Sequence, residues 1–202
     1  MIAAALELGT ATLGKALGQP CWTDGSIRPI WPGARLAGPA FTVRTTAADN
    51  LALHRALVHA SRGDVLVVAA GGIAAGFWGE ILSVAAMESG VAGLVIDGGV
   101  RDTARIEQLG FPVFARCVAI AETAKADPGE ISVPVTIGGL SIAPGDLVVA
   151  DADGVVAIPS AELEGVIERG TEIASREAVI LGRIRRGQST IEALGLGGEG
   201  AN

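Results

Sequence analysis

The sequence AGLVIDGGVRDTARIEQLG, residues 92–110, decides the fold class. It opens with an apolar run, typical of a buried strand, and the run ends at two glycines. From Asp102 onward the apolar residues recur at helical spacing, and Gly110 is a typical helix stop. The stretch therefore predicts a strand over 92–99 and a short helix over 102–110.

The same strand-and-helix pattern extends in both directions. Upstream, the continuous apolar run in GDVLVVAAGG, residues 63–72, predicts another strand covered on both faces and again ending in two glycines. Further helices are expected over 6–18, 49–61 and 78–90, and further strands over 41–44 and 111–116. Helices that alternate with apolar strands indicate an α/β domain with a largely parallel sheet.

The segment after residue 125 has a different character. Short β-rich pieces over 131–159 are joined by Gly-Gly, Pro-Gly-Asp and Asp-Gly turns, which predicts an antiparallel meander packed on the first unit. A long C-terminal helix is expected over about 160–187 with Ser160 as its N-cap, and residues 195–202 are expected to form a flexible tail. No interdomain linker is visible, so a single domain over 1–202 is predicted.

Composition limits the function. The chain has 202 residues, half of them hydrophobic, but no apolar stretch near the ~20 residues of a membrane span. Its first residues do not show the basic flank and cleavage site typical of a secretory signal, and Cys21 and Cys117 lack metal-site spacing, so a cytoplasmic protein with reduced thiols is expected. The formal net charge of −7 argues against a nucleic-acid surface.

Two strand ends carry groups that can bind an anion or a metal. Ligands of open α/β sheets gather beyond the carboxyl ends of strands. After 92–99 come Arg101, whose guanidinium can grip a carboxylate, and Asp102, a hard oxygen ligand suited to a hydrated ion such as Mg²⁺. After 63–72 comes the segment 79–82, expected in the first turn of a helix, whose free N–H groups form an anion site.

Plainer explanations exist for each feature taken alone. The glycine pairs at 71–72 and 98–99 are compatible with ordinary tight turns, and Arg101–Asp102 with a helix cap beside a solvated charge. The functional interpretation depends on the combination, because both glycine-terminated strands are followed by groups competent to bind an anion or a metal.

Several longer segments together resemble the RraA-like family. They are LGTATLGKAL (8–17), GPAFTVR (38–44), DNLALHRAL (49–57), GDVLVV (63–68), WGEIL (78–82), GVAGLVIDGGVRD (90–102), PVFAR (112–116) and PGDLVVADADGVVAIP (144–159). That family contains regulators of ribonuclease E activity and class II pyruvate aldolases, typified by 4-hydroxy-4-methyl-2-oxoglutarate aldolase. The resemblance implies a swivelling β/β/α fold, assembly as a homotrimer or hexamer, and active sites between subunits.

The resemblance also implies roles for individual residues. In the aldolases, the arginine at the position of Arg101 binds the carboxylate of a pyruvate unit. The aspartate at the position of Asp102 ligates Mg²⁺ or Mn²⁺, largely through water. The substrate also contacts the segment that corresponds here to Gly79, Glu80, Ile81 and Leu82.

Three further positions bear on the family pattern. Glu80, with twenty residues between it and Arg101, stands where the aldolases often have Asp. Glu177 matches a glutamate on the C-terminal helix that supports metal-bound waters in a neighbouring subunit of some aldolases, although a solvated helix face is the alternative. Lys15 stands where relatives commonly have Asp.

The lysines bear on the mechanism. An aldolase needs an electron sink for an enolate, either a lysine Schiff base in a dry pocket or a divalent ion. Lys15 lies on an amphipathic helix and Lys125 in a polar loop, so neither is expected to be buried, which favours the metal route. Retro-aldol cleavage would release pyruvate, oxaloacetate decarboxylation is expected as a companion activity, and a metal-bound water assisted by Glu80 is the expected base.

A non-catalytic alternative stays open. A regulator of ribonuclease E activity would bind a protein partner rather than a 2-oxo acid. The short regulators end soon after the segment matching DGVVAIP, residues 153–159, whereas this chain continues for about forty residues and supplies Glu177. The longer chain favours a carbon–carbon lyase.

Other conspicuous residues are expected to be structural. His54 and His59 lie five apart and do not share a helix face as paired metal ligands would. Asp151 and Asp153 resemble a calcium loop but lack its glutamate, so a hairpin turn is expected. The tryptophans are expected to pack, with Trp78 able to wall the site; they are Trp22, Trp31 and Trp78.

Overall fold

The computed structural model describes residues 1–46 and 48–196. Its helices are α1 (Ile2–Leu17), α2 (Leu51–His59), α3 (Glu80–Ser89), α4 (Thr103–Leu109), α5 (Leu163–Arg185) and α6 (Thr190–Leu194), with a 3-10 turn, η1, at Ser160–Glu162. Its strands are β1 (Arg28–Pro29), β2 (Leu36–Arg44), β3 (Val65–Trp78), β4 (Gly93–Val100), β5 (Val113–Val118), β6 (Glu130–Ile131), β7 (Val135–Ile137), β8 (Leu140–Ile142), β9 (Leu147–Asp151) and β10 (Gly154–Ile158).

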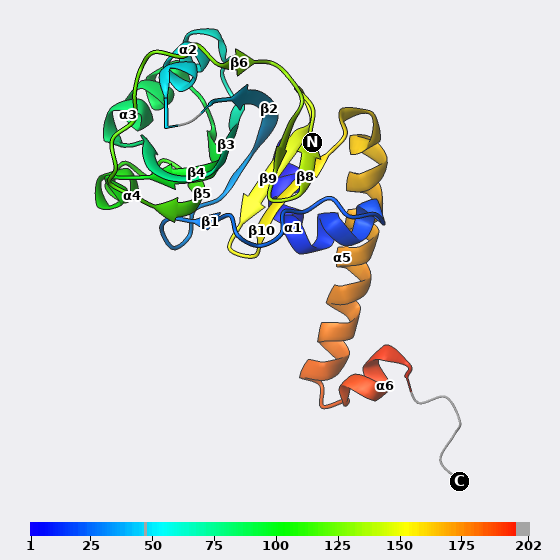
Figure 1. Ribbon diagram of the computed structural model, residues 1–202. Helices are drawn as coiled ribbons and strands as arrows, with labels where there is room; N and C mark the ends of the chain where they lie inside the picture. The colour runs from blue at the N-terminus through cyan, green and yellow to red at the C-terminus, as the bar shows by residue number, and fades with distance from the viewer. Residues whose placement is uncertain (47, 197–202) are drawn as a thin grey trace.

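One large sheet organises the molecule (Figure 1). Its strand order is β1-β5-β4-β3-β2-β9-β10, and β6 pairs with β2. Strands β2 to β5 run parallel, whereas β9 is antiparallel to both β2 and β10. The predicted α/β fold is confirmed, with its parallel centre, its antiparallel strands after residue 125 and its C-terminal helix.

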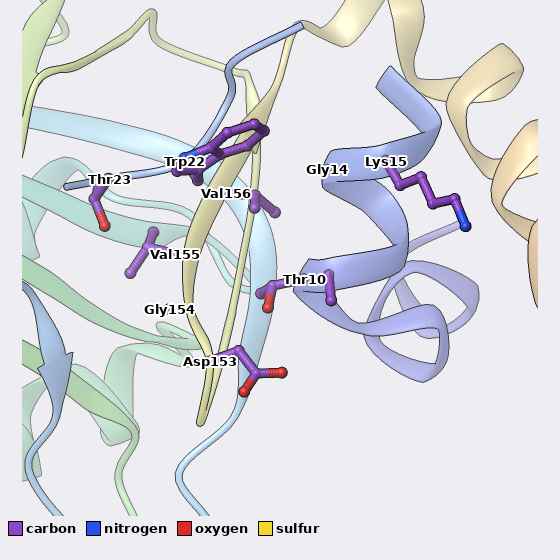
Figure 2. A pocket seen from close by; sticks show the side chains of 10 residues that line it. Thr10, Gly14, Lys15, Trp22, Thr23, Asp153, Gly154, Val155 and Val156 are labelled. Atoms are coloured by element: carbon purple, nitrogen blue, oxygen red, sulfur yellow. The ribbon is translucent and has the colours of Figure 1, made fainter. Parts of the chain in front are cut away.

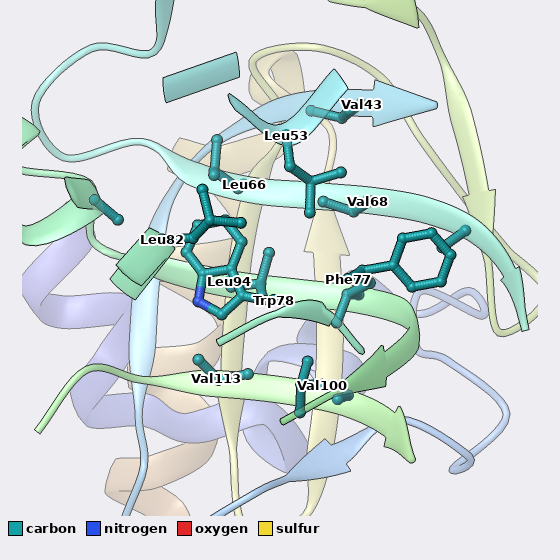
Figure 3. Packing of buried hydrophobic residues seen from close by; sticks show 14 of the residues in the cluster. Val43, Leu53, Leu66, Val68, Phe77, Trp78, Leu82, Leu94, Val100 and Val113 are labelled. Carbon is teal, nitrogen blue, oxygen red and sulfur yellow. The ribbon is translucent and has the colours of Figure 1, made fainter. Parts of the chain in front are cut away.

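Helices α2, α3 and α4 pack on one side of the parallel strands, and buried side chains fill the space between (Figure 3). This cluster includes Val43, Leu53, Leu66, Val68, Leu82, Leu94 and Ile106. Trp78 is fully buried, stacks on Phe111 at a centroid distance of 6.0 Å, and donates its indole N–H to Ser83 Oγ at 2.7 Å. Trp78 therefore packs as predicted and fixes the start of α3 against the end of β3.

The first glycine pair does not end its strand, contrary to the prediction. β3 continues to Trp78, and Gly71 and Gly72 form a bend inside it with φ values of 64° and 73°. The pairing of β3 with β4 shifts register across this bend, between Ala69 and Ile73. The segment that follows the strand therefore begins after Trp78 rather than after the glycines.

The second glycine pair also lies inside its strand. β4 continues to Val100, and neither Gly98 nor Gly99 has a positive φ. A Cβ atom on Gly98 would lie 2.8 Å from Ala70 Cβ, and one on Gly99 would lie 2.5 Å from the backbone oxygen of Ala75. Glycine is needed here because the bent β3 approaches β4 closely, not because the chain turns.

The C-terminal helix differs from the prediction at both ends. η1 occupies the expected helix start, Ser160 forms no side-chain cap, and α5 begins at Leu163. After α5 the short helix α6, which was not predicted, begins with a capping box between Ser189 and Glu192. The prediction of a flexible tail over 195–202 concerns mainly 197–202, which lie outside the described residues.

α5 projects away from the sheet (Figure 1). Only Val166 and Gly170 of its residues are buried, and both lie in its first half, near α1. Across residues 1–46 and 48–196, no helix has the length and apolarity needed to cross a membrane.

Candidate functional site

The candidate site lies where β3 and β4 end side by side. Trp78 pairs with Val100 as the last register contact between the two parallel strands. One residue later the chains part, and the Arg101 amide donates to the Trp78 carbonyl at 2.8 Å. This bond holds the start of α3 and the Arg101–Asp102 pair next to each other, as predicted from the two strand ends.

Asp102 links the two segments. It has φ 57° and ψ 31°, a left-handed conformation that few non-glycine residues adopt but that Asp tolerates. Its Oδ2 accepts the Glu80 amide at 3.1 Å and lies 3.8 Å from Arg101 Nε. Both side chains of the pair are 42% exposed, so they reach solvent and do not form an internal ion pair.

Two glycines leave room for this pair. A Cβ atom on Gly79 would overlap Asp102 Oδ2, and one on Gly76 would lie 2.9 Å from Arg101 Cδ. Gly79 has an extended backbone, with φ −159°, so its requirement for glycine is steric rather than conformational. The Arg101 and Asp102 side chains therefore pack against the backbone of Gly76 and Gly79.

A cavity of about 90 Å³ opens at this junction. Gly79, Ile81 and Leu82 line it from the start of α3, and Arg101 and Asp102 line it from the connection between β4 and α4. Amides in the first turn of a helix have no partner within the helix, so those of Ile81 and Leu82 are available to an anion. The cavity thus combines a guanidinium, a carboxylate and helix-start amides.

Three lining residues with polar side chains were not predicted: Asn50, His54 and Lys125. Asn50 is 6% exposed; its Nδ2 donates to the Phe77 carbonyl at 2.9 Å, while its Oδ1 has no partner among the described residues. Asn50 and His54 are one helical turn apart, a relation visible in the sequence once the polar residues of the 49–61 helix are compared pairwise. Lys125 comes from a distant loop, and no local pattern points to it.

His54 and Lys125 interact electrostatically. Partial burial lowers the pKa of His54, and the positive charge of Lys125 lowers it further. His54 therefore favours its neutral form and leaves the cationic character of this wall to Lys125. A second cavity of about 140 Å³ shares Asn50, Arg101 and Lys125 with the first, so the two cavities adjoin.

Two predicted site residues contribute less directly. Glu80 is exposed and interacts with Asp102 through its backbone amide, while its side chain is not among those lining the cavity. Glu177 lies on α5, where its Oε1 pairs with Lys15 Nζ at 3.1 Å. Both of those side chains are about half exposed or more, which makes the pair a surface ion pair of small energetic weight.

Asp102 fits a hydrated divalent ion. Its Oδ2 is engaged by the Glu80 amide, whereas no hydrogen bond involves its Oδ1 within the described ranges. Residues 1–46 and 48–196 contain no group of three or more His, Cys, Asp or Glu placed to cage a metal. One accessible carboxylate oxygen suits Mg²⁺ or Mn²⁺ that keeps most of its waters, and does not suit a tetrahedral zinc site.

A larger groove of about 400 Å³ lies elsewhere, between α1 and β10 (Figure 2). Trp22 forms one wall and is 53% exposed, so it packs less completely than expected. The groove shares no lining residue with the cavity at Arg101 and Asp102. Function is assigned to the smaller cavity because the guanidinium, carboxylate and amides converge there.

The remaining residues behave as expected. Asp151 and Asp153 flank the β9–β10 turn, and Asp151 accepts the Thr10 amide and hydroxyl at 2.9 and 2.7 Å. His59 is exposed, and Cys21 and Cys117 are free thiols in the part of the chain that is described.

The chain is similar to proteins of two kinds. The family model described as Aldolase/RraA, of the RraA-like group, matches residues 10–157. A Halalkalibacterium halodurans protein named "Putative 4-hydroxy-4-methyl-2-oxoglutarate aldolase" is 41% identical over 145 residues, which are 71% of this chain and 69% of that protein. The solved RNA-processing inhibitor RraA from Thermus thermophilis is 30% identical, with a TM-score of 0.68 over 74% of this chain and 92% of that one.

Streptomyces coelicolor RraAS2, described as an unusual member of the RNase ES inhibitor RraA protein family, is 30% identical with a TM-score of 0.81. That similarity covers 91% of this chain and 96% of that one. The fold, the placement of the sequence motifs and these matches agree, and the chain belongs to the RraA-like (Aldolase/RraA) family.

Proposed function

We propose that this protein is a divalent-metal-dependent pyruvate aldolase, a carbon–carbon lyase that cleaves 4-hydroxy-4-methyl-2-oxoglutarate or a related 4-hydroxy-2-oxo acid. The name carried by the Halalkalibacterium halodurans relative supports this class. The observation that carries the proposal is the convergence of Arg101, Asp102 and the start of α3 on one cavity.

The residues that line the cavity support a mode of substrate binding. The Arg101 guanidinium presents parallel N–H groups to the C1 carboxylate of a 2-oxo acid. The amides of Ile81 and Leu82 add donors from the start of α3, where the positive end of the helix dipole also favours an anion. Asn50 Oδ1, buried without a partner in the described chain, can accept a hydrogen bond from the substrate's 4-hydroxyl.

The retro-aldol step breaks the C3–C4 bond. The 4-hydroxyl loses its proton, C4–O becomes a carbonyl, and the C3–C4 electron pair becomes the enolate of pyruvate, which is then protonated at C3. A Mg²⁺ or Mn²⁺ ion held at Asp102 would supply the positive charge that stabilises this enolate. We propose Glu80, between two residues that line the cavity, as the carboxylate that assists the base.

Oxaloacetate decarboxylation is proposed as a companion activity. Loss of the C4 carboxylate of oxaloacetate as CO₂ leaves the same enolate of pyruvate. The Arg101 guanidinium and the Asp102 carboxylate would therefore serve both reactions without rearrangement.

Assembly as a homotrimer or hexamer is part of the proposal. α5 projects beyond the body of the chain and carries exposed apolar residues, Val179 and Leu181, that suit contact with another copy. Glu177 on the same helix lies away from its own chain's cavity, so any support for a metal there would be given to a neighbouring subunit.

A regulator of ribonuclease E activity is the second candidate. The similarity to RraAS2 from Streptomyces coelicolor over almost the whole chain supports it. A regulator would need a protein-binding surface but no turnover at Arg101 and Asp102, so catalysis separates the two candidates.

Release of pyruvate tests the proposal. Purified protein is given 4-hydroxy-4-methyl-2-oxoglutarate, oxaloacetate and other 4-hydroxy-2-oxo acids, with Mg²⁺, with Mn²⁺ or with a chelator. Pyruvate is expected with either ion and not with the chelator. Glu107→Gln, a change at an exposed carboxylate on α4, is the control that should retain activity. Absence of turnover with every substrate and ion would exclude the enzyme.

A further inference from the structure

Ser83 lies at the centre of a buried chain of hydrogen bonds at the start of α3. The Trp78 indole N–H donates to Ser83 Oγ at 2.7 Å, and the Ser83 hydroxyl donates to the Gly79 carbonyl at 3.0 Å. Trp78 and Ser83 are both fully buried. Because an indole N–H can only donate, the hydroxyl oxygen accepts from it, and the hydroxyl proton is directed to the carbonyl.

The Gly79 carbonyl belongs to the same peptide unit that contacts Asp102. The amide of that unit is the Glu80 N–H, which donates to Asp102 Oδ2 at 3.1 Å. A trans peptide unit is planar and its C=O and N–H point in opposite directions, so a bond that orients one end also orients the other. The peptide unit therefore connects the Ser83 hydroxyl to the Asp102 carboxylate.

Trp78 anchors this chain of bonds to the core. Its ring stacks on Phe111 at a centroid distance of 6.0 Å, and its carbonyl accepts the Arg101 amide at 2.8 Å. Trp78 thus holds Arg101 directly through its backbone and Asp102 indirectly through its indole and Ser83. A helical serine often donates to the carbonyl four residues earlier, but the indole bond also restricts rotation of this hydroxyl.

We propose that Ser83 is a positioning residue, which fixes the peptide unit between Gly79 and Glu80 and through it the carboxylate of Asp102. The inference rests on the proposed function and adds to it a residue that does not line the cavity. Without the hydroxyl, the Gly79 carbonyl keeps only the Ser83 amide, at 3.1 Å, as a partner within α3. The peptide unit then has more freedom to rotate, and Asp102 loses its fixed position.

Ser83→Ala tests the effect on catalysis. With Mg²⁺ present, kcat for pyruvate release is expected to fall about tenfold while KM changes less than about twofold. KM is retained because the Arg101 amide keeps its bond to the Trp78 carbonyl, so the guanidinium still binds the carboxylate. Trp31→Phe is the matched control: it removes an indole N–H that donates to the Phe111 carbonyl at 3.0 Å, and it should retain kcat.

Two further variants separate positioning from stability. Ser83→Ala leaves a buried indole N–H without its acceptor, so its Tm should also fall. Ile142→Val, a change at a fully buried side chain in a different core cluster, should lower Tm but retain kcat. Trp78→Phe should lower kcat about threefold, and the double variant Trp78→Phe/Ser83→Ala should have the kcat of Ser83→Ala alone, because both residues act through one chain of bonds.

Proton–nitrogen NMR tests the chain of bonds without substrate or metal. In Ser83→Ala the indole signal of Trp78 should shift, and the Glu80 amide should exchange with water faster than in the wild type. The rate should approach that of Asp102→Gly, which suits the left-handed backbone but has no side-chain acceptor. Both properties should be unchanged in Ile142→Val.

Two results would overturn the inference: Glu80 amide exchange in Ser83→Ala at the wild-type rate, or a kcat of Ser83→Ala no lower than that of Ile142→Val. If the wild type releases no pyruvate from any substrate, the proposed function fails. The exchange rate of the Glu80 amide then decides by itself whether Ser83 holds the peptide unit that contacts Asp102.

Discussion

Asp102 combines three properties. Its backbone occupies the N-cap position of α4 in a left-handed conformation, its Oδ2 accepts the Glu80 amide, and its Oδ1 has no hydrogen bond within the described ranges. Uncommon backbone conformations in non-glycine residues persist where the surroundings determine them, and they cluster at functional sites. The hydrogen bond from the Glu80 amide helps to hold Asp102 in this conformation, and it fixes Asp102 relative to α3, whose first residues line the same cavity.

Arg101 is expected to act through the shape of its guanidinium as well as its charge. Arg101→Lys keeps the positive charge but loses the two parallel donors that match a carboxylate. We predict that KM for the 2-oxo acid rises about tenfold or more, with a smaller change in kcat. Steady-state kinetics of pyruvate release measure this. Arg105→Lys, on the exposed face of α4, should leave KM unchanged, and an unaltered KM in Arg101→Lys would argue against carboxylate binding by Arg101.

At the scale of elements, the site depends on how closely β3, β4 and α3 approach. The bend at 71–72 brings the second half of β3 against β4, and glycines at 76, 79, 98 and 99 fill the places where a side chain would collide. The strand ends and the start of α3 thereby bring the amides, the guanidinium and the carboxylate together.

Gly79→Ala tests this arrangement. The backbone conformation at Gly79 suits alanine, but the added Cβ would overlap Asp102 Oδ2, so Asp102 must move. We predict a loss of pyruvate release of about tenfold or more with only a small shift in Tm. Gly165→Ala, in the first turn of α5, where the added Cβ would lie 3.1 Å from the flexible end of the Arg169 side chain, is the control and should retain activity. Full activity in Gly79→Ala would mean that the position of Asp102 is not critical.

The junction between the start of α2 and the loop 124–127, in which the Asp49 carboxylate accepts backbone amides from both segments, should be sensitive to acid. Hydrogen bonds from the amide of Leu51 and from those of the loop lower the pKa of Asp49 below its ordinary value. A carboxylate with a depressed folded-state pKa stabilises the fold fully above its unfolded-state pKa, about 3.9, and this stabilisation is lost as the pH falls through the folded-state value.

The free energy of unfolding of wild type should therefore exceed that of Asp49→Asn at pH 6, and the difference should shrink below about pH 4. Denaturant unfolding of both proteins across this range provides the measurement. A difference that stays constant from pH 6 to pH 3 would show that the charge of Asp49 does not stabilise the junction.

At the scale of the whole molecule, the second half of α5 projects away from the sheet and has no buried residue (Figure 1). If Glu177 completes the site of a neighbour, chains with Asp102→Asn and chains with Glu177→Gln should each have low activity alone. Co-refolded as an equal mixture, they should regain about a quarter of wild-type activity. Half of the sites would have an intact Asp102, and about half of those would adjoin a chain with an intact Glu177. A mixture of Asp102→Asn and Arg101→Ala chains should regain nothing, because both changes affect the same cavity. No gain in the first mixture would argue against a role of Glu177 in a neighbouring site.

The sequence predicted the fold class well, because continuous apolar runs and helical spacing are local signals. It predicted that Arg101, Asp102 and the segment 79–82 meet, because parallel neighbouring strands end at one edge of a sheet. The prediction that both glycine pairs end their strands was wrong, because glycine is favoured where two strands approach closely as well as where the chain turns. Lys125 was missed because its place depends on the bonds of Asp49 to a loop more than seventy residues away. The single domain over 1–202 and the assembly stay predictions.

The most direct test of the central claim is hydrogen–deuterium exchange at C3 of pyruvate, followed by proton NMR in D₂O. This exchange reports formation of the enolate without any need to know the full substrate. We predict exchange by the wild type with Mg²⁺ or Mn²⁺, none with a chelator, and at least about a hundredfold slower exchange by Asp102→Asn. Asn tolerates the left-handed backbone and its side-chain oxygen still accepts the Glu80 amide, so the variant should stay folded. Exchange by Asp102→Asn at the wild-type rate, or unaffected by the chelator, would contradict the claim that Arg101 and Asp102 form a metal-dependent 2-oxo acid site.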